Sequence, residues 1–358
     1  MGLLELGIRD LRNLEEVDLR PAPGVNLITG ANASGKSSLL EAVYFLGRGR
    51  SFRTHRFERL VRAGAATVQV VGRIAAGSEG SIPVGIERGR GGSRARLGGR
   101  DVRTLAELAA ALPTQVITPH RHKLLEEGPR YRRQFLDWGV FHVEPAFLPE
   151  WQRYRRALRQ RNAALRSGPR EAAEAWEPEL NQAAVALDRL RAQYVARLTA
   201  ALPAYLDPLL GSLPVGLEYR RGWSAERAFE DVLAAHRAED REQGFTGLGP
   251  HRAELTISLD GRPAADQVSR GQQKILVAAL LLAQAGLFQE LTGRCCVLLV
   301  DDVAAELDAE HRARLLRQVA ALEAQAFVTA IEAPWAGELL PDSARMFHVE
   351  HGKVREMV

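Results

Sequence analysis

The residues GANASGKSS, 30–38, stand between two segments of different pattern. GVNLIT (24–29) before them is a short apolar run rich in β-forming residues, and SLLEAVYFLG (38–47) after them has apolar residues at helical spacing. The segment itself fits the pattern G-x-x-x-x-G-K-S. A strand, a glycine loop of this pattern and a helix together predict a phosphate-binding loop in an α/β fold.

Each fixed position of the loop has a physical role. Gly30 and Gly35 permit backbone angles and close approaches that a Cβ would block, so successive N–H groups can turn toward one anion at a helix N-terminus. Lys36 would reach the β- and γ-phosphates, and Ser37 would offer its hydroxyl to Mg²⁺. The alternative is an ordinary glycine turn with a helix cap. Only four of the 48 basic residues are lysines and one occupies the motif position, which favours the phosphate loop. The predicted nucleotide-binding residues are Gly30, Ala31, Asn32, Ala33, Ser34, Gly35, Lys36, Ser37 and Ser38.

Two carboxylates end an apolar strand late in the chain, in VLLVDD (297–302). At the carboxyl end of a parallel strand they would face the ligand crevice. Asp301 would hold Mg²⁺ through its water shell, and Asp302 would accept a proton from, or orient, the attacking water. By itself such a strand end is more often a turn or a helix cap, but a phosphate loop requires a partner of this kind.

SRGQQK (269–274) precedes the most apolar helix in the chain. Ser269 is a good N-cap, which would be a sufficient structural explanation. A helix N-terminus with a serine hydroxyl and a close-approach glycine, Gly271, is also a second anion site. One polypeptide needs two such sites for one γ-phosphate only if two copies meet, which predicts a homodimer.

Composition and charge limit the class of protein. A chain of 358 residues has room for two or three domains. It has no uncharged apolar run approaching ~18 residues and begins MGLLELGIRDL, so neither a membrane span nor a signal peptide is expected and the predicted location is the cytoplasm. The segment from Gly47 to Arg103 contains thirteen arginines and only four acidic residues, and residues 151–166 contain six arginines and no acidic residue. Such patches attract a phosphate backbone, the alternative being a solvated surface. The candidate DNA-binding residues are Arg53, Arg56, Arg153, Arg155, Arg156 and Arg159.

The order of segments predicts an inserted domain. Strand-like runs at 3–11 and 14–20 precede the loop, and alternating segments from 67 to 100 predict a β-meander. Helical patterns dominate 119–239 and are too short and interrupted for a coiled-coil arm. Strands and helices alternate again afterwards, beginning with AELTISLDG (253–261) and including the apolar strand CCVLLV. We therefore expect residues 1–118 and 240–358 to share one sheet, with 119–239 as a second, helical lobe.

The order of these motifs, closed by ELD at 306–308, resembles the ATP-binding cassette superfamily. Within it the chain is most similar to the RecF family of bacterial recombination mediators, akin to the heads of the SMC proteins. The specific resemblance lies in PHRHKLLEEGPRYRRQFLDWGVFHVEP (119–145), QRNAALR (160–166), GPHRAEL (249–255) and SRGQQKILVAALLLAQ (269–284). It extends from Met1 to about Lys353, and it implies an ATPase head with a mixed sheet.

The resemblance also implies roles for single residues. The loop of Ser269, Arg270, Gly271 and Gln272 matches the signature that touches the γ-phosphate held by a partner subunit. Gln115 lies where the family's Q-loop glutamine, a metal ligand and catalytic residue, is expected. Asp308 matches the D-loop, with a helix N-cap as an equally good explanation. Asp301 matches the magnesium aspartate, and Asp302 stands with Lys36 as the catalytic pair.

Four departures qualify what the resemblance implies. Thr329 falls where transporters carry a switch histidine, and Asp302 is one methylene shorter than their catalytic glutamate, so slow hydrolysis is implied. His120 replaces an acidic residue and Glu127 a glycine, which affects the second lobe and not the phosphates.

The function implied by the resemblance is a nucleotide-timed residence on DNA. ATP and Mg²⁺ would close a homodimer on duplex or gapped DNA with little sequence specificity, and weak, DNA-stimulated hydrolysis would release it. RecR would be the protein partner, and RecA loading at damaged replication forks, replication restart and SOS induction the outcome, at the nucleoid. The alternatives are a transporter ATPase subunit, a chromosome-organising SMC head, and a nucleotide-gated scaffold without meaningful turnover.

Overall fold

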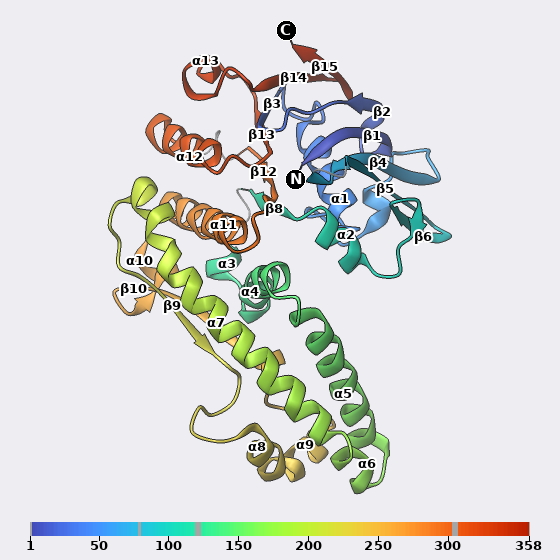
Figure 1. Ribbon diagram of the computed structural model, residues 1–358, viewed down its shortest axis with the longest axis vertical. Helices are drawn as coiled ribbons and strands as arrows, with labels where there is room; N and C mark the ends of the chain where they lie inside the picture. The colour runs from blue at the N-terminus through green and yellow to red at the C-terminus, as the bar shows by residue number, and fades with distance from the viewer. Residues whose placement is uncertain (1, 78–79, 119–122, 303–306, 358) are drawn as a thin grey trace. The chain divides into compact units, whose positions relative to one another are not determined.

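The computed structural model describes residues 2–77, 80–118, 123–302 and 307–357 (Figure 1). The chain divides into two compact units. The head unit comprises Met1–Arg121, Ala204–Gly211 and Lys274–Val358, and the helical unit comprises His122–Pro203 and Ser212–Gln273.

A mixed six-stranded sheet of order β15-β14-β3-β13-β12-β8 forms the centre of the head unit. All neighbours are parallel except β15, which is antiparallel to β14. Four of its strands, β3, β8, β12 and β13, are buried along their whole length, as parallel strands covered on both faces require. In Figure 1 the blue strand β3 lies between the red strands β14 and β13, which confirms that the two ends of the chain share one sheet. The strands are β3 (Val25–Thr29), β8 (Thr114–Ile117), β12 (Val297–Val300), β13 (Ala326–Ala330), β14 (Arg345–Glu350) and β15 (Lys353–Met357).

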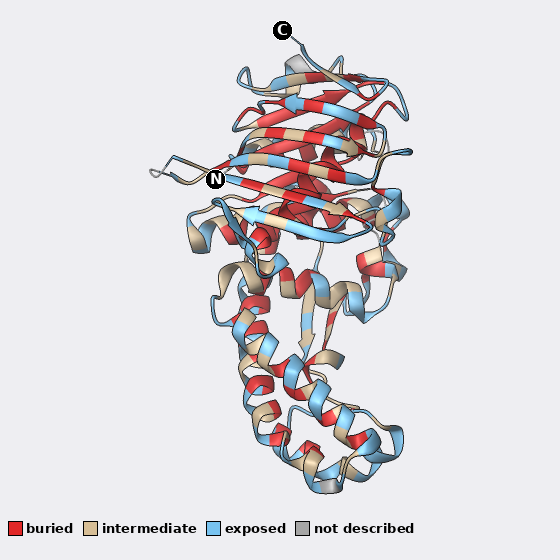
Figure 2. Cartoon of the chain, turned by 90° about the vertical axis from the view of Figure 1, so that its right-hand side faces the viewer, coloured by how far each residue is buried: buried red, intermediate tan, exposed pale blue. Residues whose placement is uncertain are grey.

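A second, antiparallel sheet of order β2-β1-β4-β5-β6-β7 confirms the predicted meander. Buried and exposed residues alternate along its strands, so one face is solvated (Figure 2). Its buried face shares one core with the mixed sheet, the helix α1 (Lys36–Arg48) and α2 (Leu105–Ala111). Helix α1 is buried along most of its length, which fixes the phosphate loop that precedes it. The strands are β1 (Leu3–Leu11), β2 (Leu14–Leu19), β4 (Thr67–Ala75), β5 (Ser81–Gly89), β6 (Gly92–Leu97) and β7 (Arg100–Asp101), and the 3-10 helix η1 is Phe57–Arg59.

Helices α11 (Arg270–Thr292), α12 (Ala309–Ala321) and α13 (Ala336–Leu339) follow in the C-terminal half. Helix α11 is long and apolar enough to cross a membrane by length and composition alone. However, 78% of its most apolar window is buried inside the protein. Residues from Ile275 to Phe288 supply much of that burial, so α11 packs as a core helix.

The helical unit is built on α4 (Pro129–Val143), α5 (Phe147–Ser167) and the long helix α7 (Glu177–Leu210), the last turns of which belong to the head unit. Two arginines, Arg161 and Arg191, are fully buried in it. Its remaining elements are α3 (Lys123–Glu126), α6 (Arg170–Glu174), β9 (Val215–Arg220), α8 (Phe229–Ala235), α9 (Arg237–Gln243), η4 (Pro250–Arg252), β10 (Glu254–Leu259), β11 (Arg262–Pro263) and α10 (Ala264–Gln267).

The helical unit differs from the expected insertion of 119–239 because it continues to Gln273. Strand β10, which we expected in the head, pairs with β9 and β11 in a separate antiparallel sheet. Its alternating burial, with Leu255 and Ile257 inward, is that of a strand with one covered face, and α4 contacts it. The sequence pattern indicated a strand there but gave no indication of its partner.

Candidate nucleotide-binding site

The phosphate loop has the backbone that its glycines predict. It runs from the end of β3 to the start of α1, with φ of 144° at Gly30 and 127° at Gly35. A Cβ on Gly30 would lie 2.2 Å from the Val349 carbonyl oxygen, so no larger residue fits there without movement of backbone. Both glycines are therefore required by conformation, and at Gly30 also by the close approach of β14.

The turn between β1 and β2 braces this loop. The Asn13 side-chain amide donates hydrogen bonds to the carbonyl oxygens of Ser34 (2.9 Å) and Ala33 (3.3 Å). Its Oδ1 accepts a hydrogen bond from Ser38 Oγ at 2.9 Å. The Gly352 N–H donates to the Ser34 carbonyl oxygen at 3.0 Å. The loop is thus held from outside by two other segments of the head unit.

Lys36 lies over the loop that precedes it. Its Nζ donates to the carbonyl oxygens of Gly30 (2.8 Å) and Ala31 (3.0 Å), and the residue is buried. The ammonium is therefore fixed at the mouth of the phosphate loop, where an incoming anion would meet it.

Asp301 meets the loop directly. It follows β12, and its Oδ1 accepts hydrogen bonds from Ser37 Oγ (2.8 Å) and Thr329 Oγ1 (3.1 Å). Burial raises the pKa of the Asp301 carboxyl, and the hydrogen bond from Ser37 opposes that rise. The structure therefore brings together two residues far apart in sequence that were predicted to share one magnesium ion.

Asp302 is held in an unusual backbone conformation beside them. Its φ is 47°, a region that non-glycine residues seldom adopt, and its N–H donates to Thr329 Oγ1 at 2.8 Å. Its Oδ1 is buried and accepts no hydrogen bond from any residue that the structure describes. One hydroxyl, that of Thr329, thus orients both aspartates.

Lys36, Ser37 and Asp302 border a cavity of about 760 Å³, whereas Asp301 and Thr329 are not part of its lining. Its lining also includes residues that no motif indicated, namely Arg12, Asn13 and Arg59. Arg53, a candidate for DNA from the charge pattern, also lines it. The full lining is Arg12, Asn13, Asn32, Ala33, Gly35, Lys36, Ser37, Ser38, Arg53, Arg59, Val61 and Asp302.

The donor set fits a magnesium–nucleotide complex. Within the described ranges of the chain, no three His, Cys, Asp or Glu side chains form a ready-made metal cluster. Mg²⁺ typically takes one or two protein ligands and completes its shell with phosphate oxygens and water, which Ser37 and Asp301 can provide for. The buried Oγ of Ser34 lacks a hydrogen-bond partner among the described residues, as does Oδ1 of Asp302. Such atoms are expected where a ligand completes the hydrogen bonding.

Gln115 is not brought to this cavity. It lies within β8, is buried, and donates from Nε2 to Gln284 Oε1 at 2.9 Å. It is paired with Leu298, three residues before Asp301, which corresponds to roughly 10 Å along a strand. Gln115 is therefore no part of the magnesium and catalytic site that we propose.

The predicted signature loop lies in the helical unit, and its four residues from Ser269 to Gln272 are all exposed. Gln272 N–H donates to Ser269 Oγ at 3.3 Å, and Ser269 N–H donates to Gln272 Oε1 at 3.0 Å. This reciprocal pair is a capping box, so the N-cap interpretation of Ser269 is confirmed. Contact with a nucleotide on a second subunit stays a prediction.

Asp308 likewise caps a helix. Its Oδ1 accepts from the His311 N–H at 2.9 Å at the start of α12, and the hydrogen bonds from His311 hold the pKa of Asp308 below its usual range. The D-loop role of Asp308 stays a prediction. Glu306 and His120, which the sequence analysis also named, lie outside the described residues.

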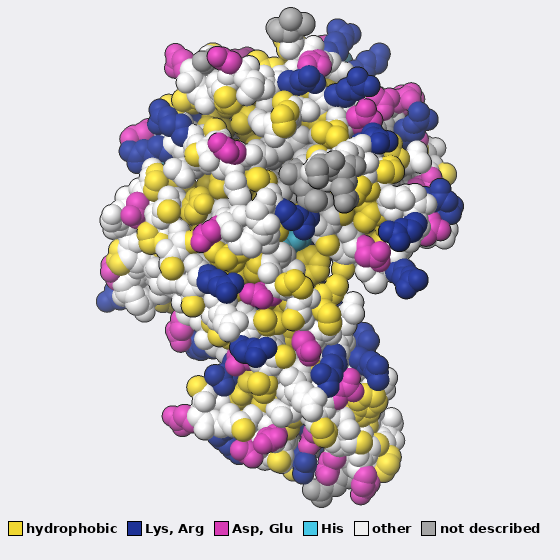
Figure 3. All heavy atoms as spheres, viewed as in Figure 1, with side chains coloured by type: hydrophobic (Ala, Val, Ile, Leu, Met, Phe, Trp, Pro, Cys, Tyr) yellow, Lys and Arg dark blue, Asp and Glu magenta, His cyan; other side chains and the backbone are white. Residues whose placement is uncertain are grey.

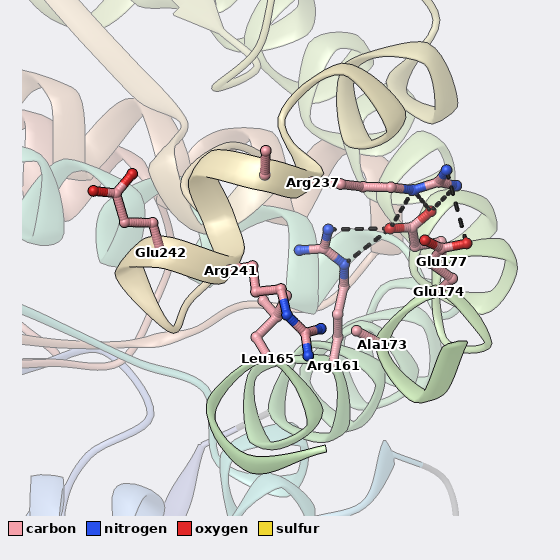
Figure 4. A pocket seen from close by; sticks show the side chains of 9 residues that line it. Arg161, Leu165, Ala173, Glu174, Glu177, Arg237, Arg241 and Glu242 are labelled. Atoms are coloured by element: carbon pink, nitrogen blue, oxygen red, sulfur yellow. Dashed lines mark hydrogen bonds and ion pairs between the residues drawn. The ribbon is translucent and has the colours of Figure 1, made fainter. Parts of the chain in front are cut away.

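The arginines of α5 do not form one continuous basic surface. Arg161 is fully buried and donates hydrogen bonds to Glu177, Asp240 and Thr246. It lines a pocket within the helical unit, and Figure 4 shows it beside Glu177 there. Arg153 lies within 4 Å of Glu150 and Glu179. Among the candidate residues, Arg155, Arg156 and Arg159 on α5 and Arg53 and Arg56 in the head unit are exposed.

Basic and acidic side chains are interspersed on the face drawn in Figure 3. Net charge alone therefore does not mark a DNA surface, and Arg155, Arg156 and Arg159 on the exposed side of α5 are its best-defined candidates.

Comparison with known proteins places this geometry. Residues 3–355 match the family model described as RecF/RecN/SMC N terminal domain. The chain is 47% identical to the DNA replication and repair protein RecF of Thioalkalivibrio sulfidiphilus and 44% identical to that of Chromohalobacter salexigens, over 99% of each chain. A solved structure of the recombination mediator protein RecF with ATP in the RecFOR pathway superposes with a TM-score of 0.88 at 24% identity, over 99% of this chain and 97% of that one. An SMC head bound to a winged-helix domain of ScpA gives a TM-score of 0.59 at 16% identity, over 100% of this chain and 98% of that one.

The fold and the site define an ATPase head of the ATP-binding cassette type, as found in RecF and SMC proteins. Within that class, the chain belongs to the RecF family of DNA replication and repair proteins. Membership of this family argues against the transporter subunit considered above.

Proposed function

We propose that this protein is an ATP-dependent DNA-binding repair protein in which bound ATP joins two copies and hydrolysis releases them. The observation that carries the proposal is the 2.8 Å hydrogen bond from Ser37 Oγ to Asp301 Oδ1 at the cationic cavity. It unites the phosphate loop with the aspartate pair, as binding of a nucleotide with Mg²⁺ would require.

Different residues of the site would bind the phosphates, hold Mg²⁺ and act on the attacking water. Lys36 and the loop N–H groups bind phosphate oxygens, and Ser37 and Asp301 would hold Mg²⁺. The ion supplies neutralisation of charge on the phosphates. Asp302, with its buried and unpartnered Oδ1, accepts a proton from water or orients it. Thr329 keeps the carboxylate of Asp301 and the backbone of Asp302 in place.

Slow hydrolysis of ATP is expected from the residues Asp302 and Thr329. Thr329 has no titratable group where transporters carry histidine, and Asp302 reaches one methylene less far than glutamate. The activity that we propose is a weak, DNA-stimulated ATPase that acts as a switch. The buried hydrogen bonds of Thr329 also suit a nucleotide-gated scaffold without meaningful turnover. Single-turnover hydrolysis with and without duplex DNA separates the two.

Dimerisation is proposed to occur through the exposed residues Ser269 to Gln272. Their capping box uses the Gln272 N–H and leaves Arg270 and Gly271 exposed at a helix N-terminus, where the first N–H groups have no partner within the helix. In a second copy these N–H groups of Arg270 and Gly271 would approach the γ-phosphate as the signature, and Asp308 is the proposed D-loop residue. Closure then depends on the third phosphate, because the donors meet the charge that it adds.

Duplex or gapped DNA, bound with little sequence specificity, is the proposed macromolecular ligand. Phosphate contacts from arginines supply attraction without base recognition. RecR is the proposed protein partner and RecA loading the proposed outcome, supported by the RecFOR pathway named for the structural relative. The proposed location is the cytoplasm, at the nucleoid.

Substitution Lys36→Ala tests the proposal. It should abolish ATP binding and, with it, ATP-dependent dimerisation and retention on DNA, because the phosphates lose their buried cation. Sedimentation velocity with Mg²⁺, with and without ATP, measures the dimer. The Leu108→Ala variant, altered in the core but not in the cavity, should dimerise as wild type does. A Lys36→Ala protein that still forms the ATP-dependent dimer would refute the proposal.

A further inference from the structure

Glu41 is a fully buried glutamate on the helix α1, which follows the phosphate loop. It lies on α1, one and a half turns after Lys36, and its side chain is 0% exposed. A charged carboxylate at such a position is costly unless it is paired and hydrogen-bonded. Its side-chain partners come from other segments of the head unit, and two of them also line the nucleotide cavity.

The first partner is Arg12, in the turn between β1 and β2. Arg12 Nε donates to Glu41 Oε2 and Nη2 donates to Oε1, each at 2.8 Å, so the guanidinium is held in a bidentate pair. The backbone of Arg12 has a φ of 57°, and its N–H donates to the Leu60 carbonyl oxygen at 2.8 Å. Its side chain, 20% exposed, lines the cavity. Glu41 therefore fixes the plane of this guanidinium and leaves its other N–H groups toward the cavity.

The second partner is the segment that follows α1. Ser51 Oγ donates to Glu41 Oε1 and accepts hydrogen bonds from the N–H groups of Arg53 and Thr54, each at 2.9 Å. Arg53 Nη1 lies 3.8 Å from Glu41 Oε2, and Arg53 also lines the cavity. Through Ser51, the Glu41 carboxylate anchors the segment that places a second cation, the Arg53 guanidinium, at the nucleotide cavity.

We propose that Glu41 is a positioning residue for triphosphate binding, which acts through Arg12 and the segment of Ser51 and Arg53. Its side chain is fully buried and is not part of the lining of the cavity. It orders two flexible cations before the nucleotide arrives, so that their side-chain entropy is not lost on binding. This inference rests on the proposed function, because it requires that the cavity binds ATP.

The competing explanation is that Glu41 merely stabilises the fold as half of a buried ion pair. Both explanations predict a lower unfolding temperature when Glu41 is changed. They differ in the affinity of the folded protein for ATP, which only a positioning role alters.

Isothermal titration with ATP and Mg²⁺ on the full chain separates them. Glu41→Gln keeps the shape of the side chain and removes its charge, and should raise the Kd for ATP about tenfold, the size of effect of one well-placed charged contact. In an Arg12→Ala background the same change should have a clearly smaller effect, because one of the two cations on which Glu41 acts is gone. Ser51→Ala, a milder change, should raise the Kd severalfold and serves if Glu41→Gln does not fold. Leu108→Ala, matched as a destabilised core variant, should keep the wild-type Kd.

Each outcome decides the inference. A weaker Kd in Glu41→Gln and Ser51→Ala, with Leu108→Ala unchanged, supports it. Wild-type affinity in both variants beside a reduced unfolding temperature overturns it and leaves the proposed function intact. Absence of ATP binding by the wild type overturns the proposed function and this inference together.

Discussion

At the scale of one residue, the buried carboxylate of Asp301 lowers the stability of the protein without nucleotide and suits the site to bind a cation. Its carboxylate is largely buried, and burial raises its pKa, so the folded protein holds the proton more tightly than the unfolded chain does. The free energy of unfolding therefore falls as pH rises from the pKa of Asp301 in the unfolded chain through its higher pKa in the folded protein. At neutral pH the buried, ionised carboxylate lowers the stability of the fold, and a bound cation would relieve that cost.

Asp301→Asn should for this reason stabilise the protein while removing its response to nucleotide. The amide oxygen still accepts from Ser37 and Thr329, and the buried charge is gone. Without nucleotide the unfolding temperature should rise by roughly 2 °C. The further rise that Mg²⁺ and ATP give the wild type should be largely abolished. Differential scanning calorimetry measures both.

The control is Asp342→Asn, at an exposed position, which should change neither value. A lower unfolding temperature for Asp301→Asn, together with wild-type stabilisation by ATP, would contradict this account of the site.

Residues with a role fixed by local backbone could be predicted from sequence. The phosphate loop and the pair at 301 and 302 were found because glycine angles, a helix start and a strand end are local features. Arg12 and Asn13 were missed because their contribution depends on a turn that approaches the loop in space. Gln115 was placed at the site by resemblance, and the structure pairs it with Gln284 instead.

At the scale of one element, α5 separates its arginines by helical period. Tyr154, Ala157, Arg161 and Leu165 are buried along one face, and Arg155, Arg156 and Arg159 lie on the exposed side. Arg155 and Arg156 lie over the rings of Trp151 and Trp176, at 6.0 and 5.8 Å from the ring centroids. The sequence predicted the helix and its charge but did not reveal that Arg161 is a core residue.

Replacing Arg155, Arg156 and Arg159 together by alanine should weaken binding to duplex DNA and flatten its dependence on salt. The slope of log K against log salt should fall by about one for each phosphate that the variant no longer neutralises. Fluorescence anisotropy at several salt concentrations measures it in the presence of ATP.

Arg153→Ala is the matched control on the same helix, because Arg153 is engaged with Glu150 and Glu179 and should contribute little. An unaltered slope in the triple variant would make this face an ordinary solvated surface.

The turn before β10 contains a histidine that should make the helical unit sensitive to acid. His251 Nε2 lies 3.0 Å from the Thr246 carbonyl oxygen and must donate to it, so Nδ1 accepts from the Tyr154 hydroxyl at 2.6 Å. Burial lowers the pKa of His251 from 6.5 to about 4. Between these values the unfolded chain binds a proton that the folded protein excludes, so stability falls as pH falls.

We expect the free energy of unfolding of the wild type to decrease from pH 7 to pH 4.5, and the His251→Gln variant, which cannot titrate, to lose less over the same range. Urea unfolding followed by circular dichroism measures both proteins. A difference between them that does not change with pH would show that His251 does not titrate in this interval.

At the scale of the whole molecule, sequence predicted the combined sheet but not the limits of the two units. Apolar strands such as β12 and β13 indicate burial on both faces, as in a parallel sheet covered on both sides, and the sheet that holds them also contains β3 from the N-terminal part of the chain. The partner of β10 and the continuation of the helical unit to Gln273 depend on pairing with β9, for which local pattern carries no signal.

The central claim is that a phosphate loop in one copy and a signature loop in another complete one site. Mixing two defective proteins tests it, namely Lys36→Ala, with an intact signature, and Ser269→Arg, with an intact phosphate loop. Neither should dimerise alone with ATP and Mg²⁺, whereas their mixture contains one complete site per pair and should form a heterodimer, detected by light scattering. If Ser269 served its own subunit, no pairing would hold a complete site, and a mixture that stays monomeric while the wild type dimerises would contradict the account.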